Sequence, residues 1–190
     1  MAILLMSTDV IKNRESGATL LEVLVALVVL SLGCIVAAGL QATSQKTNHD
    51  AQQRLIATFL VNDIIEKMRT NPGGLASYAT AGLSASNITS APAKTCKKAT
   101  PCSAIELATL DLWEWQQAMT GFSVKTGTTN VGGLIQPTGC IAVNGGSVRV
   151  TLSWFGIDAL SDTGAESGVS TCGPASANRR QVFVNTFITT

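Results

Sequence analysis

Charged residues are scarce in this chain. Only 13% of the 190 residues are charged, well below the roughly one quarter expected of a soluble globular protein, while 46% are hydrophobic. The formal net charge is +1, which does not indicate nucleic-acid binding, and no block of five like charges indicates an electrostatic tail. The low charge instead indicates a membrane segment, a large apolar packing surface, or both.

Histidine is almost absent. His49 is the only one, and we expect it on the exposed side of a helix, where it supports neither a Ser-His-Asp arrangement nor a zinc site. No glycine-rich phosphate loop follows a predicted strand. Asp158, Asp162 and Glu166 share one acidic stretch that could bind calcium, but a flexible polar loop is the better interpretation. We therefore expect no catalytic residue, no metal and no cofactor.

The five cysteines fall into two groups, one residue in an apolar stretch and four in the polar remainder. Cys34 lies in the most apolar stretch, where a thiol behaves as a small hydrophobic group. The other four lie in the polar remainder, and disulfides are favoured over zinc because no close CxxC pair exists. The four disulfide candidates are Cys96, Cys102, Cys140 and Cys172. Three connectivities are possible, of which local pairing, Cys96 with Cys102 and Cys140 with Cys172, is preferred.

Residues 23–40 contain eighteen positions without a charge. As a helix they would extend roughly 27 Å, close to the hydrocarbon thickness of a bilayer. A soluble core helix would show a polar face, and this stretch has none. Glu22 precedes the stretch directly, where a carboxylate is costly unless it is paired or reaches the interface. A secretory signal peptide cut near residues 39–44 would leave that glutamate unexplained.

Residues 16–27, SGATLLEVLVAL, resemble the processing motif of type IV prepilins. In that family a short hydrophilic leader ends in glycine, and glutamate is the fifth residue after it. The resemblance implies that prepilin peptidase cuts between Gly17 and Ala18 and methylates the new amine of Ala18. Glu22 takes the place of the fifth-position glutamate. The leader begins at Met1 or, if translation starts later, at Met6.

The resemblance also gives Glu22 a role. An unpaired carboxylate is costly inside a bundle of apolar helices. The Ala18 amine of a neighbouring subunit would satisfy it and set the axial register of a filament. The alternative is a glutamate that only reaches back to water at the membrane interface.

An amphipathic pattern continues the helix beyond Leu40. Apolar residues recur at four-residue spacing, and three more broaden the stripe. The four are Ile56, Leu60, Ile64 and Met68, and the flanking three are Leu55, Phe59 and Ile65. Residues 71–74, NPGG, end the pattern. One helix from about Ala18 to Thr70 is predicted, whose second half covers a folded domain.

The remaining residues predict one more helix. Residues 73–103, rich in Gly, Ala, Ser and Thr, read as an irregular surface segment with Lys97 and Lys98 in a solvated loop. Ser103 and Glu106 form a capping box, so a helix should run to about Met119. Within it, residues 111–115, DLWEW, resemble a DLxxW segment of the PilV group of minor pilins, and we expect Trp115 inside.

Strands follow the second helix. Residues 140–143 and 147–154 flank the turn Asn144-Gly145-Gly146, which predicts a hairpin. Val148, Val150, Leu152 and Trp154 should share the buried face. Another strand is predicted over 181–188. A strand that ends in tryptophan between two cysteine-bearing loops also resembles the PilV group.

These observations predict an α+β chain with the type IV pilin fold: a long amino-terminal helix packed on a small antiparallel sheet of three or four strands. The expected domains are a leader (1–17), the long helix (18–71; membrane and filament core 18–40, amphipathic 41–71) and a globular domain (72–190). The resemblance implies a minor pilin that is held in the bacterial inner membrane before assembly, with its amino terminus in the cytoplasm.

The partners implied are prepilin peptidase, the major pilin, other minor pilins, the inner-membrane assembly platform and a tip adhesin, with no nucleic acid. One alternative is a pseudopilin of type II secretion. The other, from a different class, is a periplasmic binding domain on an uncleaved anchor.

Overall fold

The computed structural model describes residues 19–87, 90–97, 100–122, 124–130, 132–159 and 172–189. The chain divides into two compact units, Met1–Ser44 and Gln45–Thr190, and each is described by itself. Helix α1 (Leu20–Thr70) contributes to both. It ends where Pro72 opens the short 3₁₀ helix η1 (Pro72–Tyr78), since proline disfavours helical geometry in the residue before it.

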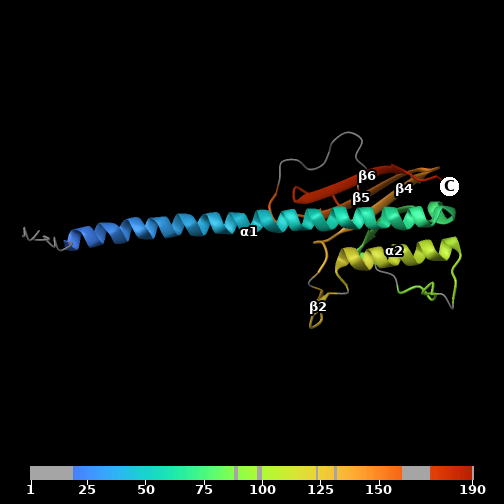
Figure 1. The fold of residues 1–190 in the computed structure, drawn as a ribbon, viewed down its shortest axis with the longest axis horizontal. Helices are drawn as coiled ribbons and strands as arrows, with labels where there is room; N and C mark the ends of the chain where they lie inside the picture. The colour runs from blue at the N-terminus through green and yellow to red at the C-terminus, as the bar shows by residue number, and fades with distance from the viewer. Residues whose placement is uncertain are drawn as a thin grey trace, which may run out of the picture. The chain divides into compact units, whose positions relative to one another are not determined.

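The second unit places α1 between other elements. A four-stranded antiparallel sheet in the order β1-β4-β5-β6 lies on one side of the carboxyl half of α1, and α2 (Ala104–Thr120) runs antiparallel to it on another (Figure 1). The strands are β1 (Thr80–Ser84), β4 (Thr138–Asn144), β5 (Ser147–Phe155) and β6 (Arg179–Phe187). Smaller elements are η2 (Ala85–Asn87) and a hairpin of β2 (Lys125–Thr126) and β3 (Thr129–Asn130). The α+β architecture predicted from the sequence is confirmed.

The buried stripe of α1 is rotated from the predicted one. Leu60, Ile64, Ile65 and Met68 are buried as predicted, but Ile56, Leu55 and Phe59 are 37%, 71% and 69% exposed. Ala57 and Val61 take their places in the core. The face of α1 that meets the core is therefore turned toward Ala57 and Val61, and the expectation for Leu55, Ile56 and Phe59 is wrong.

The central hairpin follows its sequence signals. β4 and β5 pair from Asn144↔Ser147 to Thr138↔Ser153, and Gly145 has a φ of +59°, which the tight turn requires. The predicted buried face is confirmed, because Val148, Val150, Leu152 and Trp154 are at most 2% exposed. These side chains belong to one core with residues of α1 and α2.

The segment 73–103 is more ordered than predicted. Leu75 and Tyr78 are core residues, and β1 pairs with β4 as an edge strand. Its register shifts between Thr80 and Leu83. A five-residue edge strand with an irregular register shows no clean alternation of apolar and polar residues, which is the signal on which strand prediction depends.

The capping box of α2 is confirmed. The Ser103 hydroxyl accepts from the backbone N–H of Glu106, and the Glu106 carboxylate accepts from the backbone N–H of Ser103. The ammonium group of Lys94 and then the Ser103 backbone lower the pKa of Glu106 to about 2. The helix ends at Gly121, whose φ is +66°.

Helix α2 is attached to α1 and η1 through the aspartate and the tryptophan of its DLxxW segment. Trp115 is 1% exposed and donates from Nε1 to the Leu60 carbonyl at 2.8 Å. Its ring lies against Gly139, where an added Cβ would stand 2.4 Å from a ring carbon. Asp111 accepts a short hydrogen bond from the Tyr78 hydroxyl. Burial, and then this bond, raise the pKa of Tyr78.

An ion pair completes that attachment. The Lys67 ammonium lies 2.7 Å from Glu114 and 3.6 Å from Asp111. Burial alone would lower the pKa of Lys67, but the hydrogen bond and charge of Glu114, together with Asp111 and Asp63, raise it. Lys67 therefore remains charged and bridges the two helices.

Two disulfides are present. Cys96 is joined to Cys102 and Cys140 to Cys172, the connectivity that the sequence analysis preferred. Cys34 is free and exposed. Among the residues that the structure describes, no three His, Cys, Asp or Glu side chains are grouped to hold a metal ion. Asp162 and Glu166 lie outside the described residues.

Substitution of Trp115 by phenylalanine should test the α1–α2 attachment. The change removes buried volume and a buried hydrogen bond, so the free energy of unfolding should fall by about 2–3 kcal/mol. Trp113→Phe, on the half-buried neighbour, should cost less than about 1 kcal/mol. Chemical denaturation of the detergent-solubilised chain measures both. Equal losses would show that Trp115 has no special role.

Candidate functional site

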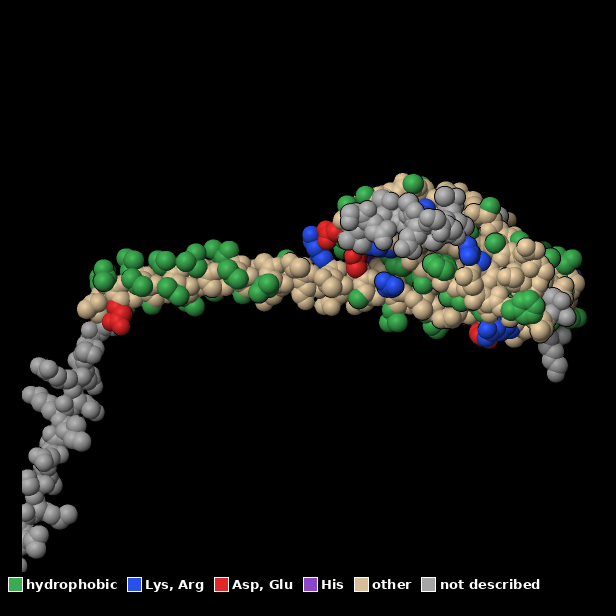
Figure 2. Space-filling model, turned by 90° about the horizontal axis from the view of Figure 1, so that it is seen from above, with side chains coloured by type: hydrophobic (Ala, Val, Ile, Leu, Met, Phe, Trp, Pro, Cys, Tyr) green, Lys and Arg blue, Asp and Glu red, His purple; other side chains and the backbone are tan. Residues whose placement is uncertain are grey.

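The described part of the first unit, residues 19–44, has no core of its own. Every residue from Thr19 to Ser44 is exposed, and an 18-residue window of the helix has a mean hydropathy of 2.8 with none of it buried. Figure 2 shows hydrophobic side chains along this segment. The large exposed ones are Leu20, Leu21, Val23, Leu24, Val25, Leu27, Val28, Val29, Leu30, Leu32, Ile35, Val36 and Leu40. Apolar groups on all sides of a helix require lipid or other protein around them.

Glu22 is the only charged residue between Thr19 and Ser44. It lies in the first turn of α1, where the positive end of the helix dipole favours a carboxylate. Its backbone N–H donates to the carbonyl and hydroxyl oxygens of Thr19, at 2.9 and 3.3 Å. None of the ion pairs among the described residues includes Glu22. Gly17 and Ala18, the other predicted site residues, lie outside the described ranges.

Two hydroxyl groups in this segment bond to their own helix. Ser31 donates to the Val28 carbonyl at 2.8 Å, and Thr43 donates to the Gly39 carbonyl at 3.2 Å. Side chains satisfied in this way suit an apolar environment, because they do not need water. Glu22 is the one charged side chain of the segment, and such an environment would leave its charge without compensation.

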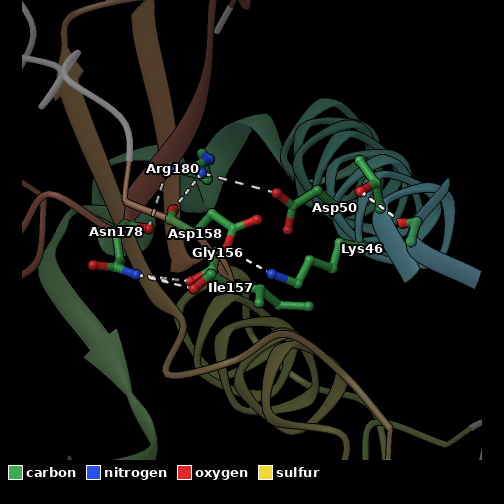
Figure 3. A network of polar contacts seen from close by, with 9 residues as sticks. Lys46, Asp50, Gly156, Ile157, Asp158, Asn178 and Arg180 are labelled. Atoms are coloured by element: carbon green, nitrogen blue, oxygen red, sulfur yellow. Dashed lines mark hydrogen bonds and ion pairs between the residues drawn. The ribbon is translucent and has the colours of Figure 1, made fainter. Parts of the chain in front are cut away.

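Within the second unit, α1 is fastened to the sheet by a polar cluster (Figure 3). Lys46 reaches the Asp158 carboxylate at 3.3 Å, and Arg180 lies 3.8 Å from Asp50. Arg180 also donates to the Asp158 carbonyl at 2.8 Å, and Asn178 donates to the carbonyls of Gly156 and Ile157. The cluster joins α1 to the end of β5 and the start of β6.

Sequence reasoning missed this cluster, because more than a hundred residues separate the partners. It also bears on the calcium hypothesis: the Asp158 carboxylate is already engaged by a lysine. Next to the cluster, His49 is half-buried instead of lying on the exposed side as predicted. No partner for its Nδ1 is present in the described part of the chain.

The distinctive property of this arrangement is a helix whose carboxyl half is amphipathic and packed in a folded domain, while its amino-terminal part is exposed and apolar and carries a carboxylate in its first turn. Comparison with known families bears on that property. Residues 12–38 match the family model of the prokaryotic N-terminal methylation motif, and residues 39–113 match the family model described as type IV pilin Tt1218. No curated protein and no solved structure gives a significant match.

The two matched segments adjoin, and together they run from the residues before Glu22 to the middle of α2. The methylation motif implies processing by prepilin peptidase and assembly with other pilins. With the long apolar helix, it fits anchoring in the inner membrane before assembly. These two matches support a type IV prepilin, and the type IV pilin family is structural and not enzymatic.

Proposed function

We propose that this chain is a minor pilin of a type IV pilus, which is incorporated into the filament or primes it. The observation that carries the proposal is the exposed apolar segment of residues 20–40, in which Glu22 is the only charge. Residues 1–17 would be the leader, 18–71 the long helix and 72–190 the globular domain. Residues 18–40 would cross the membrane once, with the amino terminus in the cytoplasm, and then enter the filament core.

The proposed assembly step depends on two charges. Cleavage between Gly17 and Ala18 creates an amine, which prepilin peptidase methylates. Lipid tails are as apolar as leucine, so apolar contacts alone give little preference for a filament over the bilayer. Pairing of Glu22 with the Ala18 amine of a neighbouring subunit does give one, because it removes an uncompensated charge.

The assignment to minor pilins rests on two short segments that resemble the PilV group. In the first, Asp111 forms a hydrogen bond with η1 and Trp115 forms one with α1. The residues that carry the resemblance are therefore also the residues that attach α2. The second is the strand that ends near Trp154, next to the Cys140–Cys172 disulfide. Partners would be prepilin peptidase, the major pilin, other minor pilins, the inner-membrane assembly platform and a tip adhesin.

A pseudopilin of type II secretion is the second candidate, because it carries the same kind of amino terminus. Incorporation into surface pili, and not into a secretion complex, distinguishes the two. A periplasmic binding domain on an uncleaved anchor would retain its function after changes at Gly17 or Glu22.

Processing gives the first test of this function. Mass spectrometry of the mature chain from cells with active prepilin peptidase should find an amino terminus at methylated Ala18. Gly17→Leu should block cleavage and leave the leader attached, because the peptidase requires the glycine before the cut. A mature terminus near Ala42 in the wild-type chain would contradict the assignment.

Glu22→Ala separates assembly from insertion. Insertion into the membrane should be no worse, because the substitution removes a carboxylate from an apolar helix. Incorporation should fall by roughly a hundredfold to a few thousandfold, since an unpaired buried charge costs about 3–5 kcal/mol and each 1.4 kcal/mol is a factor of about ten. The measurement is the ratio of chain in sheared filaments to chain in the membrane fraction.

Glu66→Ala is the matched control. Glu66 lies on the same helix, is exposed and pairs with Arg69, so its loss should leave incorporation unchanged. If the Glu22 variant enters filaments as well as the Glu66 variant does, Glu22 is only an interfacial residue and the proposed pairing is wrong.

A further inference from the structure

The outer surface of α2 carries two hollows that share one tryptophan. The first, of about 400 Å³, is lined by Trp113, Glu114, Gln117, Ala118 and Phe122. The second, of about 390 Å³, is lined by Trp113 together with apolar groups that include Leu83, Pro92 and Leu112. Trp113 therefore stands between two binding-sized spaces, and a chain-like ligand that filled both would cross its indole ring.

Gln117 is the second, independent observation. It lines the first hollow, is only 6% exposed, and its side-chain oxygen has no hydrogen-bond partner within the described part of the chain. A buried acceptor without a partner costs about 1–3 kcal/mol. The fold does not need this amide for its core, which is built from the opposite face of α2, so a donor supplied by a ligand explains the residue better than packing does.

The first hollow contains oxygen acceptors. Besides the Gln117 oxygen they include the half-exposed Glu114 carboxylate, one oxygen of which is bound by Lys67 at 2.7 Å. That ion pair leaves the rim close to neutral. Phe122 is 42% exposed and has the Lys125 ammonium 4.0 Å from its ring centroid. The site thus offers aromatic surface, oxygen acceptors and little net charge.

We propose that these hollows bind a neutral glycan chain, with one sugar ring over Trp113 and a hydroxyl group donated to Gln117. Sugar rings combine apolar C–H faces, which pack on aromatic rings, with many O–H donors, which acceptors recognise. A proline-rich peptide also docks between aromatic side chains, but it offers carbonyl acceptors and few donors. The acceptor lining therefore favours the glycan.

The test uses the full chain in lauryldimethylamine oxide, a detergent without sugar groups. Maltotetraose, cellotetraose and chitotetraose are titrated separately, and binding is followed by calorimetry and tryptophan fluorescence. At least one should bind. Trp113→Ala should weaken that binding by roughly tenfold or more, equivalent to about 1.4 kcal/mol, whereas Phe187→Ala, an exposed aromatic on β6, should leave it unchanged.

Gln117→Leu distinguishes binding from folding. It removes the unpaired acceptor, so the melting temperature should stay the same or rise, while glycan binding weakens by roughly fivefold. No binding of any of the three tetrasaccharides at millimolar concentration would overturn the proposal. So would equal binding by the Trp113 variant, or Trp113-dependent binding of decaproline in place of the glycans.

Discussion

The surface of residues 20–40 is the constraint on which the rest of the structure depends. Thirteen large apolar side chains are exposed there, on every side of the helix. Burying such a set is worth on the order of 20 kcal/mol, more than the net stability of an ordinary domain. This segment therefore has to be surrounded by lipid or by protein. Because both surroundings are equally apolar, the choice between them falls to polar groups, and Glu22 is the only charged one in the segment.

The carboxyl half of the same helix packs in the core of the globular domain. Ala57, Leu60, Val61, Ile64 and Met68 form the centre of the globular core. The helix is held there by directional contacts: the carbonyl of Leu60 accepts from Trp115, Lys67 bridges to α2, and Asp50 and Lys46 reach the β5–β6 end of the sheet. A helix fixed to its domain by several such bonds can carry that domain into an assembly as a unit. Leu55 and Phe59 remain exposed and add apolar surface on a helix whose core face is already occupied.

Local features of the sequence predicted most of the fold. The apolar stretch follows from composition alone, the start of α2 from the spacing of Ser103 and Glu106, and the β4–β5 hairpin from Asn144-Gly145-Gly146. Each of these signals acts over a few residues, so it can be read without knowing the fold.

Long-range features were not predictable in the same way. The Asp50–Arg180 pair and the Tyr78–Asp111 hydrogen bond join segments with no shared pattern. Strand β1 was missed because an irregular edge strand lacks alternation. Leu55 and Phe59 were misplaced because four-residue spacing identifies a helix face but not which of two apolar faces meets the core. The Gln117 hollow gave no sequence signal, since only the structure shows that the Gln117 oxygen is buried without a hydrogen-bond partner among the described residues.

In the proposed assembly, residues 20–40 exchange lipid for neighbouring subunits. Cys34 lies within that segment and is the free cysteine of the chain, so it reports on the exchange directly. The measurement is the rate at which a lipophilic maleimide labels Cys34 in membranes, in intact sheared filaments and in filaments dissociated by detergent. We expect rapid labelling in membranes, protection in intact filaments, and rapid labelling again after dissociation. Labelling in intact filaments as fast as in membranes, or absence of the chain from filaments, would contradict the proposed assembly.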